Sequence, residues 1–258
     1  MSKHNDQPDM KRREFIGKTV LAATAATVAP GIMLSVADAA NESAGASDKV
    51  RWGMLIDTNK CTGDCTACVD ACNKENGIDL VAKPEGHSDE RWETQRPQWI
   101  RKVTLKDKQT EETSHLPLMC QHCEFPPCVD VCPTGASFKR ADGIVMVDRH
   151  VCIGCRYCMM ACPYKARSFI HENITEQLVS APRGKGCVES CNFCATRLDA
   201  GKLTTACQDA CSTDGHQAIV FGDLNDPNSE VAKALKQQSS RQIRADLELN
   251  TGVRYTNV

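Results

Sequence analysis

The spacing of the cysteines constrains this chain more than any other feature of its sequence. Of the 17 cysteines in 258 residues, sixteen fall into four groups of four. The third group runs from Cys152 to Cys162, is followed by Pro163 and reads C-x2-C-x2-C-x3-C-P. This spacing is typical of loops that bind 4Fe–4S clusters, in which three cysteines hold one cluster and the fourth ligates another. Four such groups predict four 4Fe–4S clusters in two pairs.

In each pair of groups, the last cysteine of one group is expected to ligate the cluster that the first three cysteines of the other group hold. The sets are Cys61, Cys65, Cys68 and Cys211 (site 1), Cys72, Cys191, Cys194 and Cys207 (site 2), Cys120, Cys123, Cys128 and Cys162 (site 3), and Cys132, Cys152, Cys155 and Cys158 (site 4). Pro133 and Pro163 support the exchange between sites 3 and 4, because proline turns the chain away after the last ligand. The exchange between sites 1 and 2 has less support, since Gly63-Asp64 adds a residue to the first group and no proline follows Cys72 or Cys211.

Zinc and disulfides are the alternatives to iron. Zinc also binds four thiolates through C-x2-C pairs, but zinc sites rarely place three ligands within seven residues. The spacing therefore favours iron–sulfur clusters. Cys187 lies outside the four groups. We expect it to be a small buried residue or a loop thiol beside the fourth group, and the alternative is a replacement ligand or a thiol that links to a partner.

Histidines and basic residues also lie among the cysteines. His122 and His150 are expected to be loop residues, because each cluster already has four cysteine ligands. A basic stretch around the third group predicts a solvated face, and the alternative is compensation of cluster charge or docking of an acidic partner. The basic stretch consists of Lys139, Arg140, Arg149, Arg156, Lys165 and Arg167.

Residues 1–39 have the pattern of a twin-arginine signal peptide. Arg12-Arg13 precedes an uncharged stretch over residues 19–37, and Ala37-Asp38-Ala39 fits a cleavage site. The alternative is a retained anchor, since 19 uncharged residues can just span a bilayer. The twin-arginine route carries folded proteins, so clusters can be inserted in the reducing cytoplasm before export. We therefore expect a periplasmic protein held at the membrane by its complex.

Internal repetition organises the remaining chain. The segment after Cys132 (Pro-Thr-Gly-Ala-Ser-Phe) is echoed after Cys162 (Pro-Tyr-Lys-Ala-Arg-Ser-Phe). We expect an α+β fold of two interleaved bacterial-ferredoxin-like modules, each with two 4Fe–4S sites, short strands and helices, and long loops. The expected segments are a linker (40–50), a four-cluster domain (51–222, with an outer module at about 51–80 plus 185–222 and an inner module at about 99–172), and a C-terminal helix and extended arm (223–258).

Local patterns predict several elements. Strands are expected at 52–57 and 99–106. A hairpin is expected to turn at Asp142-Gly143 before a strand at 144–147, and an amphipathic helix is expected at 228–238. Residues 73–98 are expected to be an insertion, and the last fifteen or so residues a polar arm.

Composition excludes other classes of function. Only 41% of the residues are apolar and 5% aromatic, so metal centres are expected to replace part of the core. The net charge is −2 and no long basic run is present, so nucleic-acid binding is not expected. The chain has no G-x-G-x-x-G, no P-loop motif and no persuasive nucleophile–base pair. The sequence therefore predicts neither an enzyme nor a site for a small-molecule substrate.

Residues 50–222 resemble the four-cluster iron–sulfur subunits of respiratory complexes, such as the dimethyl-sulfoxide, polysulfide and tetrathionate reductases. The resemblance lies in the runs over 120–128, 152–163 and 191–194. The leader and the runs over 139–145, 156–163 and 221–230 are most similar to the O subunits of Dsr transmembrane complexes, which are linked to dissimilatory sulfite reductase.

This resemblance implies an electron-transfer subunit of a membrane-bound respiratory complex of sulfur metabolism. It also implies two partners: a polytopic, quinone-interacting membrane subunit and a multihaem cytochrome c. The alternative is the iron–sulfur subunit of a tetrathionate- or polysulfide-type molybdenum reductase.

Overall fold

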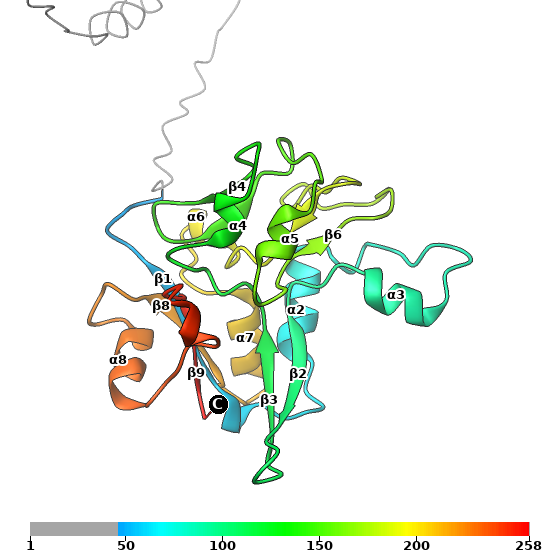
Figure 1. The fold of residues 1–258 in the computed structure, drawn as a ribbon. Helices are drawn as coiled ribbons and strands as arrows, with labels where there is room; N and C mark the ends of the chain where they lie inside the picture. Colours follow the sequence, from blue (N-terminus) through cyan, green and yellow to red (C-terminus); the bar gives the residue numbers. More distant parts are fainter. Residues whose placement is uncertain (1–45, 258) are drawn as a thin grey trace, which may run out of the picture. The chain divides into compact units, whose positions relative to one another are not determined.

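A three-stranded sheet joins the two ends of the chain that the computed structural model describes, residues 46–257 (Figure 1). Its central strand β1 (Trp52–Asp57) pairs antiparallel with β8 (Ile219–Asp223) and parallel with β9 (Val253–Thr256). Met54 and Ile56 of β1 are fully buried, and helix α8 (Glu230–Gln237) packs on β8 and β1. Consecutive residues 53–56 of β1 are all buried, so both faces of the strand are covered, and this explains its apolar run.

The other strands of the described chain form three short antiparallel pairs. These are β2 (Arg101–Lys106) with β3 (Thr113–Leu118), β4 (Ser137–Lys139) with β5 (Val145–Val147), and β6 (Ser168–Phe169) with β7 (Val188–Glu189). Gly143 adopts φ +85° in the turn between β4 and β5. Glycine suits this position because it has no Cβ to clash in the left-handed region.

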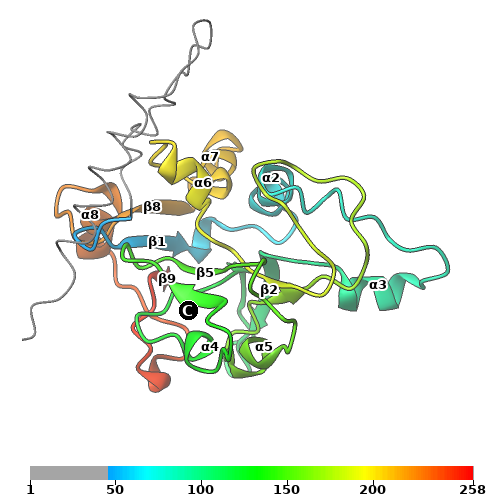
Figure 2. The same ribbon diagram turned by 90° about the horizontal axis from the view of Figure 1, so that it is seen from above.

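Most helices are short and begin within or beside the cysteine groups. They are α2 (Ala67–Glu75), α4 (Pro127–Asp130), α5 (Tyr157–Ala161), α6 (Ala195–Asp199) and α7 (Ala206–Thr213). Helix α3 (Asp89–Gln95) lies away from the cysteines, and two 3-10 turns are η1 (Thr58–Lys60) and η2 (Ala245–Leu247). Helix α2 packs on α7, and α4 packs on α5. Figure 2 shows α2, α6 and α7 on one side of the described chain and α4 and α5 on the other.

These elements match an α+β fold with small sheets and long loops. The strand at 52–57 and the hairpin at Gly143 agree with the sequence expectations, and the helix expected at 228–238 is α8. The strand expected at 99–106 begins two residues later, at Arg101. The segment expected to be an insertion contains α2's last turn and α3.

The C-terminal segment differs from the expected polar arm. Strand β9 lies in the central sheet, and both Val253 and Tyr255 are fully buried. The Tyr255 hydroxyl donates a hydrogen bond to the Pro117 carbonyl at 3.1 Å and accepts one from Gln121 Nε2 at 3.0 Å. The arm interpretation failed because the alternation of apolar and polar residues is short here, with only Val253 and Tyr255 on the buried face and Arg254 between them.

Within residues 46–257, none of the helices has the length and apolar character that a membrane span requires. The predicted signal peptide, residues 1–39, lies outside the described part of the chain.

Candidate metal centres

Site 1 brings together cysteines from opposite ends of the chain. Cys61, Cys65 and Cys68, which precede and begin α2, line one cavity with Cys211 of α7. Burial is the main cause that raises the pKa of Cys68 to about 12. Two donors face the sulfurs: the Ala218 N–H lies 3.2 Å from Cys211 Sγ, and Lys102 Nζ lies 3.3 Å from Cys61 Sγ.

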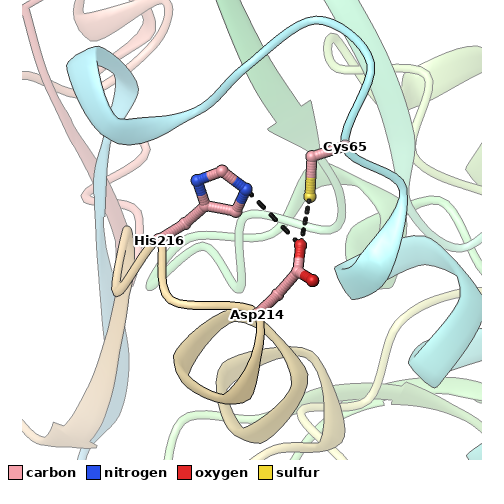
Figure 3. Close-up of side chains that lie close together, drawn as sticks. All are labelled: Cys65, Asp214 and His216. Atoms are coloured by element: carbon pink, nitrogen blue, oxygen red, sulfur yellow. Dashed lines mark hydrogen bonds and ion pairs between the residues drawn. The ribbon is translucent and has the colours of Figure 1, made fainter.

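The outer rim of site 1 carries an acid and a histidine (Figure 3). The Cys65 thiol donates to Asp214 Oδ2 at 3.4 Å, and His216 Nε2 lies 3.4 Å from the same oxygen. Asp214 is exposed and His216 is half-buried. Cysteine spacing did not reveal this pair, although Asp214 and His216 follow Cys211 closely in the sequence.

Site 3 is the most enclosed of the inner sites. Cys120, Cys123, Cys128 and Cys162 line one cavity together with Pro126, Pro127 and Arg167. All four cysteines are buried. Burial is the main cause that raises the pKa of Cys123 to about 12, so its thiol is neutral before metal binds.

Site 4 lies at the surface. Cys132, Cys152, Cys155 and Cys158 line one cavity, and Cys155 is exposed. Burial opposes ionisation of Cys132, but hydrogen bonds from Ser137 and Thr134 outweigh it and lower the pKa. The N–H of Ser137 lies 3.3 Å from Cys132 Sγ. Gly154, at φ +70°, lets the loop approach its neighbour, because a Cβ there would collide with the Gly186 carbonyl.

Site 2 combines cysteines of two helices with cysteines that precede α6. Cys72 of α2 and Cys207 of α7 face Cys191 and Cys194, and all four are buried. Burial, together with the other thiols of the site, raises the pKa of Cys72 and Cys191 far above the ordinary thiol value. Thr205 Oγ1 lies 3.3 Å from Cys207 Sγ.

The four sites follow one another in a row. Cys68 of site 1 interacts electrostatically with Cys72 and Cys207 of site 2. Cys191 of site 2 interacts with Cys120 of site 3, and Cys128 of site 3 interacts with Cys158 of site 4. The helices agree with this order, because α2 carries Cys68 of site 1 and Cys72 of site 2, and α4 of site 3 packs on α5 of site 4. The donor sets contain only thiols, which are the ligands that 4Fe–4S clusters take.

Two protein-family models match this chain, and both are described as 4Fe-4S dicluster domains. One covers residues 60–136 and the other residues 112–223. Together they span all four cysteine groups. The chain belongs to this family of 4Fe–4S dicluster proteins. Two dicluster domains hold four 4Fe–4S clusters, so the prediction of four clusters is confirmed.

Several curated proteins are similar to this dicluster protein over most of its length. The Hdr-like menaquinol oxidoreductase iron-sulfur subunit 1 of Archaeoglobus fulgidus is 40% identical over 275 aligned residues, which cover 96% of this chain and 98% of that protein. Protein NrfC of Escherichia coli is 42% identical over 200 residues (77% of each chain). One subunit of the tetrathionate reductase of Salmonella typhimurium is 37% identical over 198 residues (74% of this chain, 65% of that protein). These matches identify a ferredoxin-type iron–sulfur subunit.

Arg167 corrects the expectation of a solvated basic face. It is only 6% exposed, and its Nη2 donates to Cys128 Sγ at 3.1 Å and to Ser137 Oγ at 2.8 Å. Arg149 is also partly withdrawn from solvent, with its guanidinium 5.8 Å from the centre of the Trp99 ring. The third exception is Arg140, which is half-buried and pairs with Asp142 and Asp199. The expectation was wrong for these three residues because nothing in the local sequence distinguishes a buried arginine from a surface one.

His122 holds two loops of the dicluster protein together. Its Nδ1 accepts a hydrogen bond from the Val145 N–H at 3.1 Å, and burial is the main cause that lowers its pKa to about 3. The ring is therefore neutral and already engaged with the backbone. This agrees with the expectation of a loop residue.

Cys187, the cysteine outside the four groups, lies beside site 4. It is half-buried, and its thiol donates to the Arg149 carbonyl at 3.3 Å. It lines a surface cleft of about 320 Å³ with Arg149, Arg183 and other residues. Cys187 also interacts electrostatically with Cys152 of site 4. Its position agrees with a loop thiol, although the neighbouring group is the third rather than the fourth.

Proposed function

We propose that this chain carries electrons through a membrane-bound respiratory complex of sulfur metabolism, in the manner of the O subunit of a Dsr complex. A 4Fe–4S cluster, when bound, accepts and donates one electron. The observation that carries the proposal is the row of four all-thiol sites. Such a row offers short steps from one end of the protein to the other.

The proposed ligands are the four sets expected from the sequence, with the last cysteine of each group exchanged. Sites 1 and 2 form an outer module (about 51–80 plus 185–222), and sites 3 and 4 form an inner module (about 99–172). The packing of α2 on α7 and of α4 on α5 supports this division, because each helix pair draws on both groups of one module. Residues 1–39 are the signal peptide, 40–50 the linker, and 223–258 the C-terminal segment.

The residues around the sulfurs support transport of charge rather than turnover of a substrate. Backbone N–H groups of Ser137 and Ala218 point at ligand sulfurs, and such hydrogen bonds raise reduction potential. The buried cysteines of sites 2 and 3 keep water away from the middle of the row. We propose that the chain has no substrate site of its own and works as one subunit of an oxidoreductase.

A partner protein would dock beside site 4. Exposed large apolar side chains gather there, at the surface next to the exposed Cys155. They are Ile153 (67% exposed), Tyr157 (54%) and Met160 (65%), and Phe125 (63%) is exposed in the loop of site 3. Contiguous exposed apolar side chains mark sites of protein interaction. We assign this face to the polytopic, quinone-interacting membrane subunit and the polar rim of site 1 to a multihaem cytochrome c.

We propose that the protein is periplasmic. The twin-arginine leader would export it folded, and the membrane subunit would hold it at the bilayer. A second candidate is the iron–sulfur subunit of a molybdenum reductase, which the identity to the tetrathionate reductase protein favours.

Metal analysis and affinity purification of the native complex test this proposal. Anaerobically purified protein should contain about sixteen iron atoms and sixteen acid-labile sulfides per chain. Zinc in place of iron would refute the proposal. Haem c and a polytopic protein in the purified complex would support the Dsr-type assignment, whereas a molybdenum subunit would support the second candidate.

A further inference from the structure

One buried cation lies between the sulfurs of two sites. Arg167 follows Cys162 in the loop before β6 and is 6% exposed. Its Nη2 donates to Cys128 Sγ of site 3 at 3.1 Å, and the guanidinium also faces Cys158 of site 4. Cys120 of site 3 faces it as well. A single guanidinium thus contacts or faces ligands of both inner sites.

The position of Arg167 is fixed by β4. Ser137 Oγ accepts a hydrogen bond from Arg167 Nη2 at 2.8 Å. The N–H of the same serine donates to Cys132 Sγ of site 4. The first residue of β4 therefore holds the guanidinium on one side and a ligand sulfur on the other.

Arg167 has no carboxylate partner among residues 46–257. Its Nη1 is buried without a hydrogen-bond partner. Two other withdrawn arginines differ: Arg183 pairs with Glu189 at 3.0 Å, and Arg140 pairs with Asp142 at 2.9 Å. A buried charge needs a counter-charge to be tolerated. The groups that face Arg167 and can supply one are the cysteine sulfurs.

We propose that Arg167 is the shared counter-cation of sites 3 and 4 and favours the reduced state at both. This inference rests on the proposed ligand sets. Reduction adds one electron at a site and makes it more negative, while no bond forms or breaks and no proton moves. A fixed positive charge in a buried environment favours that extra electron, and a hydrogen bond to a ligand sulfur acts in the same direction. Arg167 also lies where it offsets repulsion between electrons held at the two sites.

The test is a potentiometric titration of the full-length, iron-loaded protein with dithionite, followed by electron paramagnetic resonance. In Arg167→Gln, the ratio of reduced to oxidised centres at fixed potential should fall about tenfold at two of the four sites. For a one-electron couple this corresponds to a reduction potential lower by about 59 mV. The other two should not change. Arg167→Lys keeps the charge, so its ratio at these two sites should stay close to that of the wild type. Arg140→Gln is the matched control, because that arginine is paired with carboxylates, and it should match the wild type.

Each outcome decides one question. Unchanged potentials at all four sites in an Arg167→Gln protein with full iron content would overturn the inference, and so would an equal shift at all four. If Arg167→Gln fails to load iron, Arg167→Lys and Ser137→Ala replace it. Both keep the charge but alter its hydrogen bonds, so both should lower the ratio at the same two sites by less than tenfold, and no change would overturn the inference. Wild-type protein without about sixteen iron atoms would refute the proposed function instead.

Discussion

The rings of His122 and Phe193 stack with their centroids 3.6 Å apart and their planes 24° apart. Both residues occupy the third position of a C-x2-C pair, one in site 3 and the other in site 2. Both also have positive φ, +44° and +51°. The stack therefore joins two cysteine loops that lie far apart in the sequence, at the point where the two halves of the row meet.

Phe193→Ala should weaken this junction. Phe193 is 1% exposed and also contacts Phe221 edge to face, with centroids 5.2 Å apart. Removal of the ring leaves a cavity, and such changes cost about 3–5 kcal/mol. The free energy of unfolding of the iron-loaded protein, measured with denaturant, should fall by this amount. Phe125→Ala is the control, because Phe125 is exposed, and a cost as large as that of Phe193→Ala would contradict the packing role.

Tyr255→Phe should destabilise the protein at neutral pH. The hydroxyl bonds both Pro117 and Gln121 in a fully buried setting, and an unpaired buried acceptor costs about 1–3 kcal/mol. Denaturant unfolding of wild type and variant at neutral pH measures the difference. An unchanged midpoint would show that water or a shift of β9 replaces these bonds.

The same tyrosine predicts a pH dependence. Burial is the main cause that raises the pKa of Tyr255 above its ordinary value of about 10. The unfolded phenol ionises near pH 10 while the folded one stays neutral, so the folded state holds more protons above that pH. Stability from this group is therefore present below about pH 10 and is lost as pH rises further. Tyr255→Phe should show a shallower alkaline loss of stability than wild type.

The cysteine spacing was informative because metal ligands must converge on a small centre, which fixes their separation along the chain. For this reason four clusters were predictable before any geometry was known. The apolar run of β1 and the amphipathic pattern of α8 were equally visible, since burial there follows a local period. The positions of Arg167 and β9 were not predictable. Their burial depends on contacts with Cys128, Ser137 and Pro117, which lie in other parts of the sequence and leave no local pattern.

Lys102→Met should affect one cluster at the end of the row. Lys102 Nζ donates to Cys61 Sγ at 3.3 Å, to the Thr62 carbonyl, and to the Cys65 carbonyl at 3.0 Å. These bonds hold the loop that contains the extra residue. We expect faster iron loss from one cluster in air and a reduced-to-oxidised ratio that falls by less than tenfold, because this lysine is only half-buried and solvent screens its charge.

Lys106→Met is the control for this change. Lys106 lies on the same strand, β2, but pairs with Glu111 at 2.7 Å and is exposed. It should match the wild type in iron retention. Equal behaviour of the two variants would show that Lys102 does not hold the loop of site 1.

Cys162→Ala tests the exchange of ligands between the inner sites. Cys162 is the last cysteine of the third group in sequence, but it lines the cavity of Cys120, Cys123 and Cys128. Its loss should therefore damage site 3 and leave site 4 intact. The change in the electron paramagnetic resonance spectrum should match that of Cys123→Ala and differ from that of Cys155→Ala. A double variant, Cys123→Ala with Cys162→Ala, should lose no more iron than the more damaged single variant, because both changes affect one cluster. A spectrum that matches Cys155→Ala would instead place Cys162 on the cluster of its own loop.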